Sequence, residues 1–419
     1  MSVVKPDVKF ICLRDAIASD SVTNLDVVVR ITIPEIKTNQ KRPMLNLGLV
    51  IDRSGSMHGA KMEYARQAAI YGVQQLVECD RETVRCDRLS VTIYDDEVEV
   101  IIPSQQVKDK SDIIHRIKRI QPDGMTALYD GWLEGATQVS QHLQPESLNR
   151  VILLSDGLAN VGETNPDVIG NDVHGLSKRG VSTTTMGIGD DFNEDLMQGI
   201  ALSGDGNYYY IQNPDQLPSI FNAELQGIMA TIGQRVSLGI RTFVGVELVD
   251  VFNDLEKTEY GNYKLPNLIA GNEFDMVLRL KIPAMAKSEC LVNFRLAYDD
   301  SESQSRKVSH HKLELPVVTS KELNEYPFNE EVRARVARLM ASRAKEEAIK
   351  SLDRGDFART KERLQMAKQE MMDSGISLEM MAPEMAEMDG LLDDLDEGNT
   401  KSMRKNAQFQ NYQKRRNRP

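Results

Sequence analysis

The chain has few cysteines, few aromatic residues and no long apolar run. Only four cysteines, Cys12, Cys79, Cys86 and Cys290, occur in 419 residues. This is too few for a disulfide framework, so we expect reduced thiols, although Cys79 and Cys86 are also spaced to pair. No stretch approaches the roughly 20 apolar residues of a membrane span, and no apolar signal segment follows Met1. These absences predict a cytoplasmic protein.

Length and charge narrow the class of protein further. A chain of 419 residues exceeds the usual size of a single core, so two or three domains are expected. The formal net charge is -12 and the pI is about 5.2, which disfavours nonspecific binding to nucleic acid. We therefore expect no nucleic-acid partner.

The charge is distributed unevenly near the C-terminus. Residues 385–399 contain acidic and no basic side chains, whereas residues 401–419 contain basic and no acidic ones. Such blocks usually form solvated tails or docking segments. We interpret residues 401–419 as a docking arm for an acidic protein surface, either on another copy or on this chain's own body. A disordered solubilising tail is the alternative.

The most informative motif follows a mostly apolar run at residues 45–51. That run predicts a buried parallel strand, and Asp52-Arg53-Ser54-Gly55-Ser56 comes directly after it. One carboxylate and two hydroxyls at alternate positions can converge on one cation at the strand's carboxyl end, where open α/β sheets place their sites. Gly55 is expected to adopt a conformation that a β-carbon would resist.

Two later segments supply the same kind of oxygen donor. Thr126 lies in the polar segment 123–128, and Asp156 follows a second apolar run at residues 151–154. Hydroxyl and carboxylate oxygens suit Mg²⁺, with Mn²⁺ or Ca²⁺ as alternatives. The absence of paired Cys or His at these positions argues against zinc. We predict a magnesium site.

Together, the three loops resemble the metal-ion-dependent adhesion site of von Willebrand factor A (VWA) domains, whose pattern is DxSxS, then Thr, then Asp. Asp52, Ser54, Ser56, Thr126 and Asp156 match all five positions. The resemblance implies a non-enzymatic module in which an acidic residue of a protein partner takes the open position on the metal. It also implies that one of the two aspartates ligates directly and the other through water. Such a module would be a subunit or adaptor of an intracellular assembly.

The surrounding sequence alternates between strand and helix patterns. Helices are expected at 61–79, 113–120, 128–143, 194–203 and 217–232, and further strands at 89–94 and 182–188. Strands separated by helices in this way predict a doubly wound parallel sheet. We assign this α/β domain to residues 44–232.

The flanking segments read as strands without intervening helices. They lie at 8–13 and 25–33 before the α/β domain and at 236–240, 244–251, 275–282, 290–298 and 307–317 after it. A lone pair of strands is rarely stable, so segments 1–43 and 233–319 should form one antiparallel β-sandwich. This arrangement resembles bacterial VWA proteins and inter-α-trypsin-inhibitor heavy-chain-like proteins, in which a β domain brackets a VWA insert.

The region 320–382 is expected to be helical. Apolar residues at helical spacing over 329–351 and 356–373 predict an antiparallel hairpin joined by a short link. We interpret the methionine-rich segment 366–388 as a contact surface, because it borders the charged tail at 383–419.

Other chemistries lack their motifs. The sequence Gly187-Ile188-Gly189 is too short for a dinucleotide fingerprint, and no GxxxxGK[ST] or GxSxG sequence occurs. His58 is the only candidate base near the serines, and we expect it to be a surface residue at a helix start. A metal-dependent hydrolase or phosphatase using the same oxygens is the alternative function.

Overall fold

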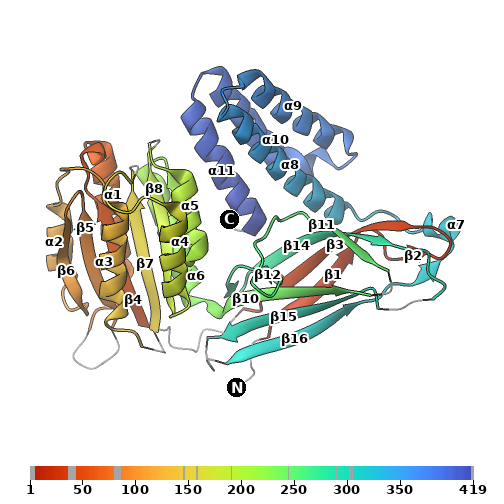
Figure 1. Ribbon diagram of the computed structural model, residues 1–419, viewed down its shortest axis with the longest axis horizontal. Helices are drawn as coiled ribbons and strands as arrows, with labels where there is room; N and C mark the ends of the chain where they lie inside the picture. Colours follow the sequence, from red (N-terminus) through yellow and green to blue (C-terminus); the bar gives the residue numbers. More distant parts are fainter. Residues whose placement is uncertain are drawn as a thin grey trace. The chain divides into compact units, whose positions relative to one another are not determined.

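A computed structural model describes residues 5–35, 44–79, 86–144, 147–156, 159–189, 191–243, 245–287, 290–301, 303 and 305–416. The chain divides into two compact units (Figure 1). Unit 1 comprises Met1–Lys37 and Thr231–Pro419, and unit 2 comprises Thr38–Ala230. The predicted domain boundary between residues 43 and 44 lies at the edge of a gap in the described residues. Arg418, in the predicted basic segment 401–419, lies outside the described residues. Within the described ranges, no helix has the length and apolar character needed to cross a membrane.

A six-stranded sheet forms the centre of unit 2, in the order β6-β5-β4-β7-β8-β9. The strands are β4 (Met44–Asp52), β5 (Arg88–Tyr94), β6 (Val98–Gln106), β7 (Ser147–Ser155), β8 (Val181–Ile188) and β9 (Asp205–Ile211). All neighbours are parallel except β5 and β6. The chain places β5 on one side of β4 and later returns to place β7 on the other. The order therefore reverses between β4 and β7, which is where open α/β sheets bind ligands.

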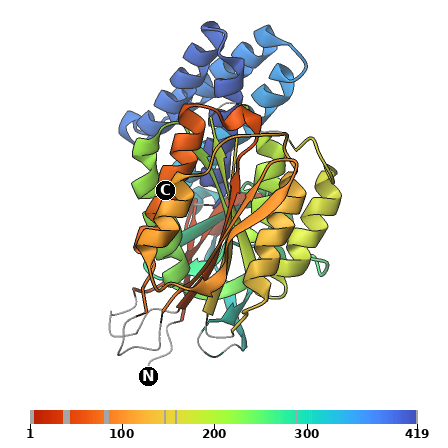
Figure 2. The ribbon, with the colours of Figure 1, turned by 90° about the vertical axis from the view of Figure 1, so that its left-hand side faces the viewer.

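Helices cover both faces of this sheet (Figure 2). They are α1 (Ala60–Gln75), α2 (Lys110–Lys118), α3 (Leu128–Ser140), α4 (Pro166–Ser177), α5 (Glu194–Ser203) and α6 (Leu217–Met229). Alternate residues of β4, including Leu47 and Leu49, pack in one cluster with α1, α2 and α6. Gly48 faces the opposite way, where its Cα lies against α3. Because side chains alternate along a strand, an almost wholly apolar β4 buries both faces.

Three elements of unit 2, β6, β9 and α4, were not anticipated. β6 is an antiparallel edge strand with a half-exposed side-chain pattern, so it lacks the continuous apolar run of the central strands. α4 has a detectable start signal, because Asn165 accepts a hydrogen bond from the Asp167 backbone and Pro166 occupies the first turn. The helix was not predicted because its apolar residues show only a weak helical periodicity.

Unit 1 contains two antiparallel sheets that share a hydrophobic core. The first has the order β1-β3-β14-β11, with β1 (Asp7–Cys12), β3 (Thr23–Thr32), β14 (Glu273–Ile282) and β11 (Glu247–Val251). The second has the order β12-β10-β15-β16, with β13 (Leu268–Ile269) also paired to β10. Its other strands are β12 (Tyr263–Lys264), β10 (Thr231–Thr242), β15 (Val292–Asp300) and β16 (Arg306–Leu313). A short parallel pair, β2 (Ile17–Ala18) and β17 (Val317–Val318), adjoins α7 (Ser320–Leu323).

The segments before and after the α/β domain share one sheet. β3 pairs with β14 in a continuous antiparallel register from Thr23↔Ile282 to Thr32↔Glu273. Cross-strand ion pairs reinforce this register, since Arg30 makes a bidentate contact with Asp275 at 2.7–2.8 Å and Arg279 does the same with Asp26.

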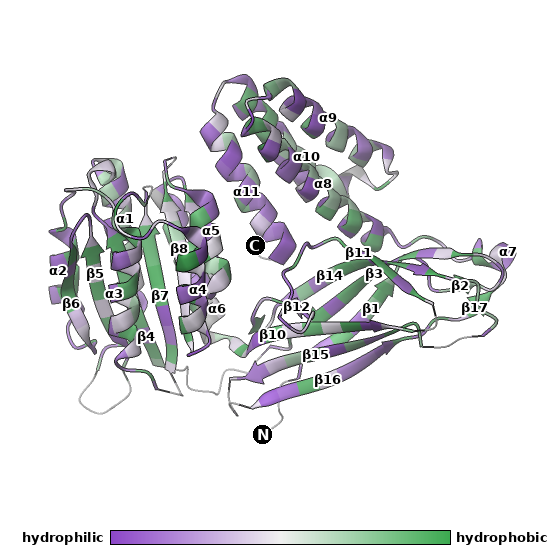
Figure 3. Ribbon diagram, viewed as in Figure 1, coloured by the Kyte–Doolittle hydropathy of each residue, from purple (hydrophilic) through white to green (hydrophobic). Residues whose placement is uncertain are grey.

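Four long helices complete unit 1: α8 (Glu330–Leu352), α9 (Phe357–Asp373), α10 (Leu378–Asp396) and α11 (Thr400–Arg416). The predicted α8–α9 hairpin is present, and the predicted fold class of parallel-sheet α/β domain, antiparallel sheets and C-terminal helices is confirmed. The structure differs from the expectation of a charged tail, because the acidic run lies in α10 and the basic run in α11. The side of α11 that is seen in Figure 3 is mostly hydrophilic. The helix nevertheless buries Met403, Ala407 and Tyr412.

The methionine-rich segment packs inside the helical layer. Met371, Met381 and Met388 are each at most 4% exposed and lie in one cluster with alanines of α8. The interpretation of this segment as a contact surface is therefore wrong for these three residues, although Met366 and Met372 are exposed. Flexible thioether side chains fill the irregular gap between helices.

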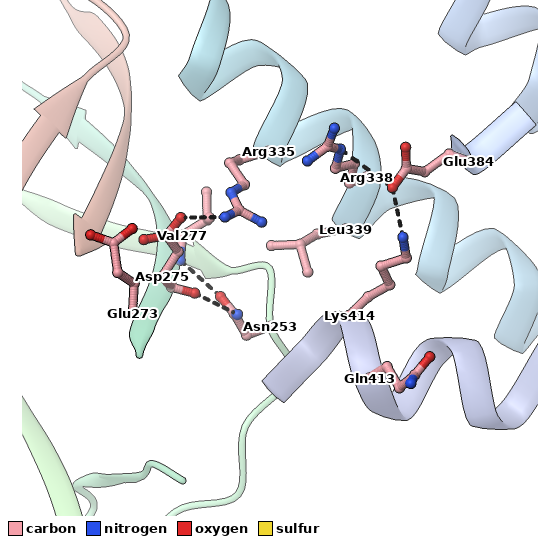
Figure 4. A pocket seen from close by; sticks show the side chains of 10 residues that line it. All are labelled: Asn253, Glu273, Asp275, Val277, Arg335, Arg338, Leu339, Glu384, Gln413 and Lys414. Carbon is pink, nitrogen blue, oxygen red and sulfur yellow. Dashed lines mark hydrogen bonds and ion pairs between the residues drawn. The ribbon is translucent and has the colours of Figure 1, made fainter. Parts of the chain in front are cut away.

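Charged contacts join α8 to the sheet of β14, and α11 to α10 (Figure 4). Arg335 of α8 pairs with Asp275 of β14 at 2.8 Å, and Lys414 of α11 pairs with the buried Glu384 of α10 at 2.8 Å. These residues line a cavity of about 380 Å³. The cationic side chains in its lining pair with acidic ones, so their charges offset one another. We therefore interpret the cavity as a polar contact region between the sheet and the helices.

One cysteine pair is oxidised in the structure. Cys79 and Cys86 form a disulfide with Cα atoms 4.7 Å apart, so the expectation of reduced thiols is wrong for this pair. Cys12 and Cys290 are free thiols. Spacing alone could not decide the pairing, because a disulfide requires the two Cα atoms to lie close together in the folded chain.

Candidate functional site

The candidate site lies at the carboxyl ends of β4 and β7, at the switch point of the sheet. The parallel register pairs Ile51 with Leu154, which sets Asp52 beside Ser155. Ser155 donates a hydrogen bond of 2.6 Å from its hydroxyl to Asp52 Oδ2. The sheet itself thus brings the first carboxylate next to the strand end that carries Asp156.

The loop after β4 turns its oxygens toward one another. The Ser54 backbone N–H donates to Asp52 Oδ1 at 2.8 Å, and this contact bends the chain immediately after the strand. The hydroxyls of Ser54 and Ser56 lie 3.1 Å apart. Ser56 then donates to Asp156 Oδ1 at 2.8 Å. Four of the five predicted residues therefore form one connected group of oxygens.

The fifth predicted residue lies in an adjoining loop that is tied to the first one. Thr126 is buried, its backbone N–H donates to Asn160 Oδ1 at 2.9 Å, and its carbonyl accepts from the Asn160 backbone at 3.1 Å. The two loops are joined by hydrogen bonds from Gly55 N to Gly124 O and from Asp123 N to Arg53 O. These contacts fix the loop of Thr126 against the serine loop.

Glycines allow this close approach, although not in the predicted way. Gly124 has a φ of +67°, and a β-carbon there would come within 2.0 Å of Asp96 Oδ1. Gly55 does not have a positive φ, so the expectation of a special conformation at Gly55 is wrong. A β-carbon on Gly55 would instead press on the Gly124 carbonyl at 3.2 Å.

The two carboxylates differ in electrostatic environment. Both Asp52 and Asp156 are 0% exposed. Burial raises the pKa of Asp52 to about 6, and hydrogen bonds from Ser155 and Ser54 offset this only in part. Asp156, in contrast, contacts a cation, because Lys61 Nζ lies 2.6 Å from its Oδ2. Of these two carboxylates, Asp52 is therefore the one whose ionised form would gain more from a nearby positive charge.

Lys61 approaches the site from the first turn of α1. Its Nζ also lies 3.0 Å from Asp191 Oδ2, and its side chain is 24% exposed. Partial burial opposes its charge, but hydrogen bonds to Asp156 and Asp191 outweigh that effect, and the pKa of Lys61 is raised. Lys61 is therefore a protonated ammonium at neutral pH.

The donor set suits a hard cation. Among the described residues, no group of three or more His, Cys, Asp and Glu is arranged to hold a metal ion, so an ion here would depend on serine and threonine hydroxyls as well as carboxylates. Two buried carboxylates beside two hydroxyls form an all-oxygen set of the kind that Mg²⁺, Mn²⁺ or Ca²⁺ prefers. The residues therefore fit such an ion.

The parallel-sheet core of unit 2 is that of a von Willebrand factor A type domain, and comparison with known proteins agrees. Residues 46–223 match the family described as von Willebrand factor type A domain. The VWA domain predicted from the sequence is thereby confirmed for this part of the chain.

Curated relatives match over the same region. The chain is 31% identical to protein sll0103 of Synechocystis sp. over 195 residues, which is 46% of this chain and 44% of that protein. It is 28% identical to YfbK of Escherichia coli over 225 residues, or 54% of this chain and 36% of that protein. Inter-alpha-trypsin inhibitor heavy chain H3 of Bos taurus is 28% identical over 46% of this chain and 21% of its own length. The matched segments thus span less than half of each relative.

Two solved structures share the fold over nearly the whole chain. The von Willebrand factor type A protein from Catenulispora acidiphila has a TM-score of 0.65 at 17% identity, covering 94% of this chain and 90% of its own. The ArnB paralog VWA2 from Sulfolobus acidocaldarius has a TM-score of 0.59 at 17% identity, covering 97% and 98%. These likenesses concern the fold alone.

Three residues that contact the site were missed from sequence. Ser155 precedes Asp156 directly and could have been found from the parallel register of two strands with known ends. Asn160 lies in a loop, and nothing local marks it as the partner of Thr126. Lys61 follows the motif closely, but its reach back to Asp156 depends on where α1 begins.

Proposed function

We propose that unit 2 is a metal-dependent protein–protein interaction module. A divalent cation, Mg²⁺ first, would be held by Asp52, Ser54, Ser56, Thr126 and Asp156. Its remaining coordination position would take an acidic residue of a partner, as the likeness to VWA domains implies. The observation that carries the proposal is the connected group of two buried carboxylates and two hydroxyls at the switch point of the sheet.

The chemistry of the site supports a binding role. Bound Mg²⁺ would supply a Lewis-acidic position that attracts a carboxylate, and Mg²⁺ usually keeps exchangeable waters. One aspartate would ligate directly and the other through water. Arg53 pairs with the nearby buried Asp95 at 2.9 Å, and the guanidinium offsets the negative charge of that carboxylate.

Hydrolysis has less support. It needs a base within reach of an attacking water, and His58 is exposed, with Nδ1 2.5 Å from the Gly55 carbonyl. VWA domains are typically protein-interaction modules. We therefore propose that the whole protein is a subunit or adaptor of an intracellular assembly.

Two measurements on the full chain test this function. Calorimetry should detect Mg²⁺ binding in the wild type and lose it in Asp52→Asn. A protein captured from a lysate of the source cells in Mg²⁺ should be released by a chelator and should not bind Asp52→Asn. Replacing the captured protein's acidic contact residue by its amide should abolish the interaction. Metal binding without any carboxylate-dependent partner would overturn the interaction role.

A further inference from the structure

We propose that Lys61 makes the metal-loaded site cationic, lowering its affinity for Mg²⁺ and raising its affinity for a partner's carboxylate. This inference rests on the proposed function. It concerns the charge that remains once the ion is bound.

The contacts of Asp156 carry the first step. Both its oxygens are engaged, Oδ1 by the Ser56 hydroxyl at 2.8 Å and Oδ2 by Lys61 Nζ at 2.6 Å. Asp156 is completely buried, so little water screens its pairing with Lys61. Asp191, the other partner of Lys61, has a 54% exposed side chain and is screened much more.

The charge balance carries the second step. Asp52 and Asp156 bring two negative charges to the site, and Lys61 returns one positive charge to the same group of side chains. Counting these three side chains and leaving out Asp191, which solvent screens, the protein part holds a single net negative charge. With a divalent cation bound, one positive charge is left over, whereas a site without Lys61 would be neutral.

Two opposite consequences follow. A neighbouring ammonium repels the ion, so it weakens Mg²⁺ binding. The surplus positive charge of the loaded site attracts an anionic ligand, so partner carboxylate and Mg²⁺ should strengthen each other's binding by the same factor. Mg²⁺ would then be held firmly only while a partner is engaged.

The experiment compares the full chain as wild type, Lys61→Met and Lys61→Arg, with Lys118→Met as a charge-matched control at an exposed position on α2. Calorimetry gives the Mg²⁺ affinity in chloride buffer and again with acetate as a minimal carboxylate. Lys61→Met should bind Mg²⁺ about tenfold more tightly or better in chloride. Acetate should strengthen Mg²⁺ binding in the wild type and in Lys61→Arg, and clearly less in Lys61→Met.

A purely structural Lys61 gives a different pattern. If Lys61 only held Asp156 in place, Lys61→Met would weaken Mg²⁺ binding and would leave the effect of acetate intact. Weaker Mg²⁺ binding in Lys61→Met overturns the proposal, and so does an unchanged effect of acetate. Thermal melts guard against misfolding, because Lys61→Met should be destabilised without Mg²⁺ and restored by it, while Lys118→Met should match the wild type. A wild type that binds no Mg²⁺ refutes the proposed function, and this inference with it.

Discussion

Ser56 donates a 2.8 Å hydrogen bond to Asp156, a residue 100 positions further along the chain. This contact joins the loop after β4 to the end of β7 and closes the group of oxygens on which the proposed metal site depends. It forms because the two strands are parallel neighbours with their carboxyl ends at one edge. The following predictions test what this arrangement does.

The first prediction concerns Asp52. Asp52→Asn keeps the shape of the side chain but removes a buried charge, so it should raise the melting temperature in the absence of metal. It should weaken Mg²⁺ binding by more than the roughly 10–100-fold that loss of an outer-shell partner costs. Calorimetry and thermal melts check both effects. Unchanged Mg²⁺ affinity would remove Asp52 from the ligand set.

The second prediction concerns pH. Burial raises the pKa of Asp52 from 3.8 to about 6. This folded-state pKa lies above the unfolded value, so protonation of Asp52 stabilises the folded protein. That stabilisation is fully present below about pH 4 and is lost as the pH rises through about 6. Mg²⁺ binds the ionised carboxylate, so the increase in melting temperature that it causes should be small at about pH 5 and larger at about pH 7.5.

Melts with and without Mg²⁺ across this range measure the effect. The same series in Asp52→Asn is the control, in which the change near pH 6 should disappear. A Mg²⁺-induced shift that stays constant across the range would contradict the assignment of Asp52.

The third prediction concerns Thr126. Its backbone is fixed by Asn160, so Thr126→Ala should preserve the loop while removing one hydroxyl. We expect a loss of Mg²⁺ affinity below about tenfold and a larger loss of partner binding. Thr126→Ser, which keeps the hydroxyl, is the matched control. Equal losses in both variants would indicate that the hydroxyl does not matter.

The fourth prediction concerns the shared sheet of unit 1. A fragment lacking residues 1–43 would leave β14 without β3, exposing its edge and the core beneath it, so it should aggregate. Size-exclusion chromatography measures this. The fragment 44–230, which comprises the VWA domain alone, should remain monomeric and folded. Equal solubility and thermal stability of the first fragment and the full chain would refute the shared sheet.

The fifth prediction concerns α11. Met403 is completely buried in unit 1, so Met403→Ala should cost about 2–5 kcal/mol of unfolding free energy without changing Mg²⁺ affinity. Phe357→Ala, at a position that is 53% exposed on α9, should cost far less. Denaturant unfolding supplies both values. If Met403→Ala were neutral, the basic run would behave as the free tail that its composition suggests.

The sequence could identify the parts of the site because each is local. An apolar run predicts a buried strand, and Asp52, Ser54 and Ser56 follow it within one turn of chain. Asp156 follows a second such run. The α/β class also emerged from local alternation of strand and helix patterns.

Tertiary structure decided what depends on distant contacts. Lys61 reaches Asp156 only because α1 begins where it does, and β3 meets β14 through pairing of segments on opposite sides of the VWA domain in the sequence. The charged C-terminal runs form helices because burial of apolar residues such as Met403, which packs against residues of α8 and α10, outweighs their polar composition. Local propensity determines which elements can form, whereas packing determines which of them persist and which side chains meet.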